Sequence, residues 1–199
     1  MSPRTTGPET ASRILAAAAD CFAQRGYEAT GVAEICSKAG VSKGAFYHHF
    51  PTKQFAFLAL LDRWLAILDL QLTATRESSL TVPEALERIA GLSRIVFESA
   101  SGQLPMFLEF WKQSIHDPQV WQATIAPYKR YREFFQLLLE EGVVDGSFRE
   151  VDTRIGGLLV VALAVGVLLQ GLMDPDGADW GEILQQGMRI MMRGMQGDS

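Results

Sequence analysis

Apolar residues recur along most of the chain at spacings of three and four, which is the period of an α-helix. No segment shows the strict alternation of apolar and polar residues expected of a half-buried strand. The pattern therefore predicts an all-α protein with about nine helices. We expect these helices at residues 9–25, 32–39, 43–50, 52–76, 81–100, 105–116, 117–141, 155–173 and 178–195.

Residues 26–53 carry the most informative local pattern, two short helices joined by a tight turn. The first helix has its apolar residues on one face: Val32, Ile35, Cys36 and Ala39. Gly40 is suited to end it in the left-handed conformation, and Ser42 is placed to cap the second helix. Pro51 ends that second helix because its ring disfavours helical geometry in the preceding residue.

The second short helix has a buried side and a polar side. Phe46 and Phe50 are four residues apart and face inward. The outer side carries donors and a glycine, without an acidic residue: Lys43, Gly44, Tyr47, His48 and His49. Two helices joined by a glycine-containing turn, with such an outer face, predict a helix-turn-helix that inserts this reader helix into the DNA major groove.

Residues 13–58 resemble the DNA-binding domain of the TetR (tetracycline-repressor) family of transcription regulators. The resemblance rests on RILAAAADCFAQRGYEAT, VAEICSKAGVSKGAFYHHF and PTKQFAFL, in this order. It implies a three-helix head followed by a helical ligand-binding and dimerisation domain, in which the last two long helices pair with their symmetry mates. One departure is Gly31, where the family usually has Thr or Ser, so Thr30 becomes the candidate for the hydroxyl contact to phosphate.

We expect residues 1–53 to form the DNA-binding domain and residues 54–199 to form the ligand-binding and dimerisation domain. The resemblance implies that the partner is a double-stranded, palindromic DNA operator bound by a homodimer. The residues expected to contact phosphates are Thr30, Ser42, Tyr47 and Lys53. The residues expected nearest the base edges are Lys43, Gly44, His48 and His49.

The distribution of charge agrees with a protein that presents one end to DNA. The whole chain has a formal net charge of −5. Residues 1–53 contain six Lys or Arg and four Asp or Glu, a net charge of +2, which leaves −7 on residues 54–199. A basic head on an acidic body favours localised contact with DNA over non-specific binding by the whole surface.

Catalytic and metal-binding chemistry is not indicated. The sequence lacks the nucleophile-elbow, Walker, zinc-protease and dinucleotide-binding motifs. The two cysteines, Cys21 and Cys36, are predicted core residues in a reducing compartment, outside any cluster with metal-ligand spacing. We therefore expect a cytoplasmic protein that is not an enzyme, with neither a metal nor a cofactor.

The segment from Ile155 to Met173 leaves an alternative open. Its nineteen uncharged residues approach the length needed to span a bilayer. We favour a helix buried in a soluble body and dimer, because Arg154 and Asp174 adjoin its ends and an aromatic belt is missing. A membrane-anchored helical protein is the rival hypothesis.

The C-terminal part is rich in aromatic residues that suit either a core or the wall of a cavity. The family resemblance implies a cavity for a small-molecule effector in this part. Our candidates for its wall are Phe107, Trp111, Tyr131 and Phe135. We thus expect a ligand-responsive regulator, most simply a repressor released by an apolar or aromatic effector. The alternative within this fold is a DNA-binding protein without an effector.

Overall fold

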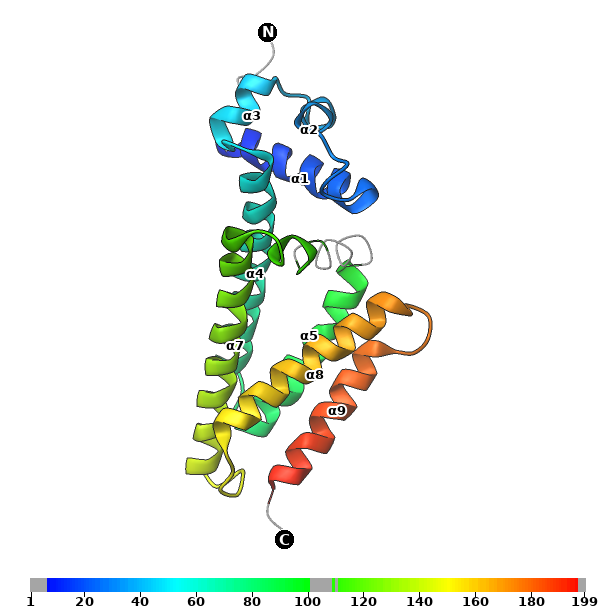
Figure 1. Cartoon of the computed structure of the whole chain (residues 1–199). Helices are drawn as coiled ribbons and strands as arrows, with labels where there is room; N and C mark the ends of the chain where they lie inside the picture. Colours follow the sequence, from blue (N-terminus) through cyan, green and yellow to red (C-terminus); the bar gives the residue numbers. More distant parts are fainter. Residues whose placement is uncertain (1–6, 101–108, 110, 197–199) are drawn as a thin grey trace. The chain divides into compact units, whose positions relative to one another are not determined.

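The computed structural model describes residues 7–100, 109 and 111–196, and it is all-α over these residues (Figure 1). A short helical stretch at residues 111–114 adds to the labelled helices. The predicted all-α fold with about nine helices is confirmed. The labelled helices are α1 (Gly7–Arg25), α2 (Val32–Ala39), α3 (Lys43–His49), α4 (Lys53–Glu77), α5 (Val82–Ala100), α7 (Pro118–Val144), α8 (Thr153–Met173) and α9 (Trp180–Met195).

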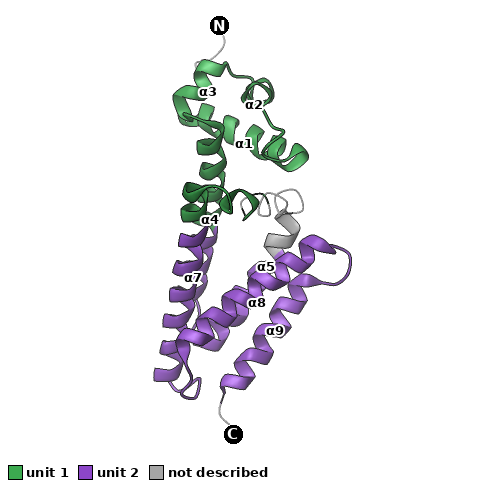
Figure 2. Ribbon diagram, viewed as in Figure 1, with its two compact units in different colours: residues 1–67, 102–123 green, residues 68–101, 124–199 purple. Residues whose placement is uncertain are grey.

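The chain divides into two compact units (Figure 2). Unit 1 consists of residues 1–67 and 102–123, and unit 2 consists of residues 68–101 and 124–199. Both α4 and α7 contribute residues to each unit, so the chain passes between the units within continuous helices. The predicted boundary between residues 53 and 54 separates a DNA-binding part from a ligand-binding and dimerisation part, and it stays a prediction.

Helices α1 to α3 form a head around a shared core in unit 1. Helix α1 buries a stripe of apolar residues that includes Ile14, Ala18, Cys21 and Phe22. Gly26 follows it with φ of +79°, and Gly40 ends α2 with φ of +63°, a region in which only glycine avoids a steric penalty. The two glycines thus allow the sharp turns that bring the three helices together.

The start of α4 turns Phe55 outward and Ala56 and Phe57 inward. The Phe55 side chain is 51% exposed, whereas Ala56 and Phe57 are fully buried. The Phe57 ring lies 5.4 Å from that of Phe22 and 4.6 Å from that of Tyr27. Spacing alone does not specify this face, because several helical faces satisfy the same spacing where apolar residues are dense.

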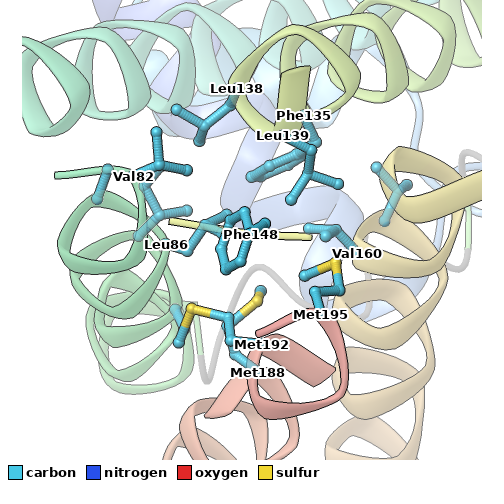
Figure 3. Close-up of a cluster of buried hydrophobic side chains, with 14 of the residues drawn as sticks. Val82, Leu86, Phe135, Leu138, Leu139, Phe148, Val160, Met188, Met192 and Met195 are labelled. Carbon is cyan, nitrogen blue, oxygen red and sulfur yellow. The ribbon is translucent and has the colours of Figure 1, made fainter. Parts of the chain in front are cut away.

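Unit 2 is built around one apolar core to which α4, α5, α7, α8 and α9 all contribute (Figure 3). Phe148, from the loop after α7, also enters this core, and its N–H donates to the carbonyl oxygen of Gly142 at 2.8 Å. Helix α7 runs to Val144, beyond the predicted end at residue 141. Met188 is 2% exposed within the same core.

Two glycines let α8 approach α7 closely. A Cβ atom on Gly157 would lie 2.7 Å from the carbonyl oxygen of Arg132 and 2.9 Å from the backbone nitrogen of Gln136. A Cβ atom on Gly156 would lie 2.5 Å from a methyl group of Leu139. Glycine costs helix stability. At Gly157 glycine is required because the backbone of α7 lies too close for a Cβ atom, whereas at Gly156 the close neighbour is the end of the Leu139 side chain.

Candidate nucleic-acid interface

Helix α3 is fixed by a cap at its start and by an aromatic anchor beneath it. The N–H of Ala45 donates to the Ser42 hydroxyl at 3.1 Å, which is the predicted N-cap. Phe46 is fully buried, and its ring lies 5.9 Å from that of Phe50. These contacts set the rotation of the helix, so its opposite side faces outward.

The outward side of α3 carries the residues expected from the sequence. Lys43, Gly44 and His48 are exposed, and the Tyr47 side chain is 50% exposed with its ring edge-on to Phe46. A Cβ atom on Gly44 would meet only the Ser42 hydroxyl, at 3.8 Å. The surface around Gly44 is therefore open enough for a close approach of a DNA groove.

His49 differs from its neighbour in its surroundings. It is half-buried, with its ring 5.2 Å from that of His48 and 6.3 Å from that of Phe50. A Cβ atom on Gly7, at the start of α1, would lie 3.8 Å from its Cε1. His49 therefore packs against the head, and His48 is the more exposed of the two histidines.

Thr30 does not occupy a surface position, in contrast to the expectation that it contacts phosphate. Its side chain is 1% exposed. The hydroxyl donates to the carbonyl oxygen of Gly26 at 2.8 Å and lies 3.2 Å from that of Cys21. Thr30 therefore secures the turn after α1, and its side chain is not exposed for a phosphate contact.

Lys53 is also engaged within the head. Its Nζ donates to the carbonyl oxygen of Tyr27 at 2.7 Å and to that of Thr30 at 3.1 Å. The same ammonium lies 4.1 Å from the centroid of the Tyr27 ring, a cation–π contact. In this structure Lys53 thus ties the start of α4 to the loop before α2, rather than pointing freely outward as a phosphate ligand would.

Arg13 is a residue of the head that the sequence did not single out. Its guanidinium donates to the carbonyl oxygens of Ala39 and Gly40, at the end of α2. Helices end with unsatisfied carbonyl groups, and a cation there is stabilising. Arg13 therefore fixes α1 against the turn of the helix-turn-helix and helps to orient α3.

Replacing Thr30 by valine should lower the stability of the head without weakening its intrinsic affinity for DNA. The change removes the donor to two carbonyl groups, at a cost of roughly 1–2 kcal/mol. Urea unfolding should show this loss, while operator affinity at a temperature where both proteins are folded stays within about twofold. Thr30→Ser, which keeps the hydroxyl, is the control. If the valine variant were as stable as the wild type but bound DNA more weakly, the result would support a contact between Thr30 and phosphate.

A second group of contacts joins the head to residues 109–123 within unit 1. The side-chain amide of Gln54 donates to the carboxylate of Asp117 at 2.7 Å. The amide of Gln113 donates to the carboxylate of Glu28 at 2.9 Å. Backbone N–H groups of Gln119 and Val120, with Gln54 adding less, lower the pKa of Asp117, so this carboxylate is ionised and accepts all three bonds.

The candidates for an effector site are distributed over both units. Trp111 is half-buried in unit 1, whereas Tyr131 and Phe135 belong to α7 in unit 2. Phe135 is 7% exposed and is part of the apolar core. Phe107 lies outside the described residues. These positions remain proposals as effector contacts.

Both cysteines are core residues, as the sequence predicts. Cys21 and Cys36 are both buried and unbridged. Burial is the main cause that raises the pKa of each thiol, so both stay protonated and unreactive. Among the residues that the structure describes, there is no group of three or more His, Cys, Asp or Glu that could hold a metal ion.

Comparison with protein-family models gives two adjoining matches. Residues 14–60 match the model described as bacterial regulatory proteins of the TetR family. Residues 84–193 match the model described as the C-terminal domain of BetI-type transcriptional repressors. The chain is 32% identical over 162 residues to the transcriptional repressor KstR2 of Mycolicibacterium smegmatis, an alignment that covers 75% of this chain and 73% of that repressor.

Solved structures with the same fold include proteins captured with ligands. A transcriptional regulator from Saccharomonospora viridis in complex with choline has a TM-score of 0.82 and 23% identity, covering 94% of this chain and 96% of that one. FadR from Bacillus subtilis in complex with stearoyl-CoA also has a TM-score of 0.82, with 18% identity, covering 93% of this chain and 99% of that one. At these identities the likeness establishes the fold.

The capped reader helix, its exposed donors and the helical body define a helix-turn-helix DNA-binding transcription regulator and not an enzyme. The family matches cover the head and most of the body. The chain belongs to the TetR family of transcriptional regulators.

Proposed function

We propose that the protein is a homodimeric repressor that binds a palindromic operator through residues 1–53. Residues 54–199 bind a small apolar or aromatic effector, which releases the DNA, and also form the dimer. The observation that carries the DNA-binding part is the geometry of α3, which buries Phe46 and presents Lys43, Tyr47 and His48. A repressor function is supported by the likeness to KstR2 and by the match to the repressor C-terminal model.

The support for a dimer comes from α8 and α9, which lie side by side (Figure 1). Each keeps a helical stripe of apolar or small residues that the single chain leaves exposed or half-buried. On α8 the stripe comprises Ile155, Leu159, Ala162, Gly166 and Met173. On α9 it comprises Ile183, Gly187, Ile190 and Gly194. Paired with the same stripes of a second copy, these residues would form a four-helix interface.

The same surface bears on the membrane alternative. Among the described residues, α8 is the one helix long and apolar enough to cross a membrane, and 33% of its apolar window is buried in the single chain. Residues 84–193, which include α8, match the repressor C-terminal model. We therefore assign the exposed part of α8 to the dimer and place the regulator in the cytoplasm. Solubility of the purified protein without detergent tests this assignment.

Effector control is supported by the ligands of two structural neighbours, choline and stearoyl-CoA. The contacts of residues 109–123 with the head provide a route by which a change in the body reaches α3. A ligand that shifts α4 or α7 would alter the separation of the two heads on an operator of fixed spacing. If no small molecule changes operator affinity, the alternative of a TetR-fold protein without an effector holds.

Lys43→Ala tests the reader helix. Losing one ammonium near the DNA should lower operator affinity and reduce the slope of log K against log salt by about one. Tyr47→Phe should weaken binding to all sequences alike, because a phosphate contact carries no base information. Both effects are measurable by fluorescence anisotropy on a duplex selected by the protein from a random pool. A change of sequence preference in Tyr47→Phe would contradict this assignment of roles.

A further inference from the structure

The hydroxyl group of Tyr131 on α7 is buried without a hydrogen-bond partner among the residues that the structure describes. The rest of the side chain packs against the apolar core of unit 2. Buried polar groups in native proteins are nearly always hydrogen-bonded, because leaving one unsatisfied costs its full desolvation penalty. No described group forms a hydrogen bond of normal geometry with this hydroxyl group, so it can still accept a ligand atom as its partner.

Two charged side chains lie beside Tyr131 and satisfy each other. The guanidinium of Arg130 lies 5.3 Å from the centroid of the Tyr131 ring. It also donates to the carboxylate of Asp69, on α4, at 2.7 Å. Both side chains are near enough to shift the pKa of the Tyr131 hydroxyl, but neither forms a hydrogen bond of normal geometry with it. The pair is neutral as a whole, and it joins α4 to α7 within unit 2.

The state of the phenol follows from these surroundings. Burial first, and the Asp69 carboxylate second, raise the pKa of Tyr131 far above its ordinary value. The phenol is therefore protonated at any physiological pH and is available as an O–H donor. A carboxylate ligand at this point would be repelled by Asp69 and would compete with it for Arg130. A neutral acceptor brings no uncompensated charge into the site.

We propose that the Tyr131 hydroxyl group donates a hydrogen bond to a neutral carbonyl oxygen of the effector, such as that of an ester, thioester or amide. The proposal rests on the proposed function, since it concerns the effector of that regulator. The remainder of the effector is apolar, because Tyr131 packs against the apolar core of unit 2, to which Phe135 and Leu138 belong. Binding here acts next to Asp69, and thereby on α4.

Three sets of probes with matched chains separate the polar groups. They are methyl esters of saturated fatty acids of about eight to sixteen carbons, the corresponding free acids, and alkyl methyl ethers without a carbonyl. Affinities are followed by tryptophan fluorescence. The wild type should bind its best ester about tenfold more tightly than the matching acid or ether, the effect of one well-placed hydrogen bond.

Tyr131→Phe removes only the donor. It should lower ester affinity about tenfold and leave ether affinity unchanged. Without ligand, its melting temperature should equal or exceed that of the wild type, since an unsatisfied hydroxyl has been removed. Tyr128→Phe is the matched control, one turn earlier on α7 and packed against the same core. It should retain the wild-type preference for esters.

Several results would overturn the proposal. A clearly lower melting temperature for Tyr131→Phe would mean that the hydroxyl is already bonded within the chain. Equal ester affinity in wild type and variant, equal binding of acids and esters, or no ester binding in the series would remove the carbonyl contact. Binding of the wild type to a selected duplex is measured alongside. If the wild type binds the selected duplex, a negative result with the esters removes only the Tyr131 contact. If the wild type does not bind the duplex, the proposed function as a DNA-binding regulator is contradicted.

Discussion

Ile190→Glu should give a folded monomer whose operator affinity is reduced by more than about a hundredfold. Ile190 is 69% exposed in the single chain, so the substitution leaves the core of unit 2 intact. In the proposed dimer it would place an unpaired carboxylate in an apolar interface, at a cost of roughly 3 kcal/mol or more. A monomer also reaches only one half-site. Light scattering gives the mass and anisotropy gives the affinity.

The control is the same substitution at Ile115, which is 76% exposed and lies outside α8 and α9. Ile115→Glu should remain a dimer and bind the operator as the wild type does. Met188→Glu should instead unfold the protein, because Met188 belongs to the core of the single chain. A dimeric Ile190→Glu variant with wild-type affinity would place the interface elsewhere.

A double variant, Gln54→Ala with Gln113→Ala, should uncouple the effector from the operator. It removes the two amide hydrogen bonds that join residues 109–123 to the head, to Asp117 and to Glu28. In the wild type we expect the effector to weaken operator binding about 5–150-fold, the usual range of allosteric coupling. In the double variant this factor should fall close to one, while operator affinity without effector is kept.

The measurement compares operator affinity with and without a saturating probe. The methyl esters, stearoyl-CoA and choline are the probes, the last two because structural neighbours bind them. By linkage, the operator must weaken probe binding to the wild type by the same factor. In the double variant the operator should leave probe binding unchanged. Gln136→Ala, which removes a comparable 2.9 Å bond to Glu140 within α7, is the control. If the effector released the double variant from the operator as it releases the wild type, the coupling would not depend on these two hydrogen bonds.

The positions of the helices could be predicted from the sequence because capping residues and glycines mark their ends. Ser42 caps α3 as expected, accepting from a backbone N–H three residues on, and Asp152 caps α8 in the same way. Gly40 ends α2 in the left-handed conformation. Helix α9 begins at Trp180, two residues after the predicted start, because the side chain of Asp179 accepts the capping hydrogen bond.

The roles of individual polar residues were less accessible. Thr30 and Lys53 have side chains that suit phosphate contact, but the same groups also satisfy carbonyls inside a fold. The choice depends on Tyr27, whose ring and carbonyl oxygen receive the Lys53 ammonium from 26 residues away. Likewise, the Asp69–Arg130 pair spans 61 residues of sequence. Such contacts depend on how helices pack, which spacing along the chain does not specify.

The most direct test of the central claim is the composition of the complex with selected DNA. The protein selects duplexes from a random pool, and sedimentation then gives the mass of the complex with the enriched sequence. A homodimeric TetR-family regulator predicts an inverted repeat, with half-sites about 34–36 Å apart or a multiple of it. It also predicts an even number of protein chains per duplex. A non-repeated sequence bound by a single chain would contradict the account.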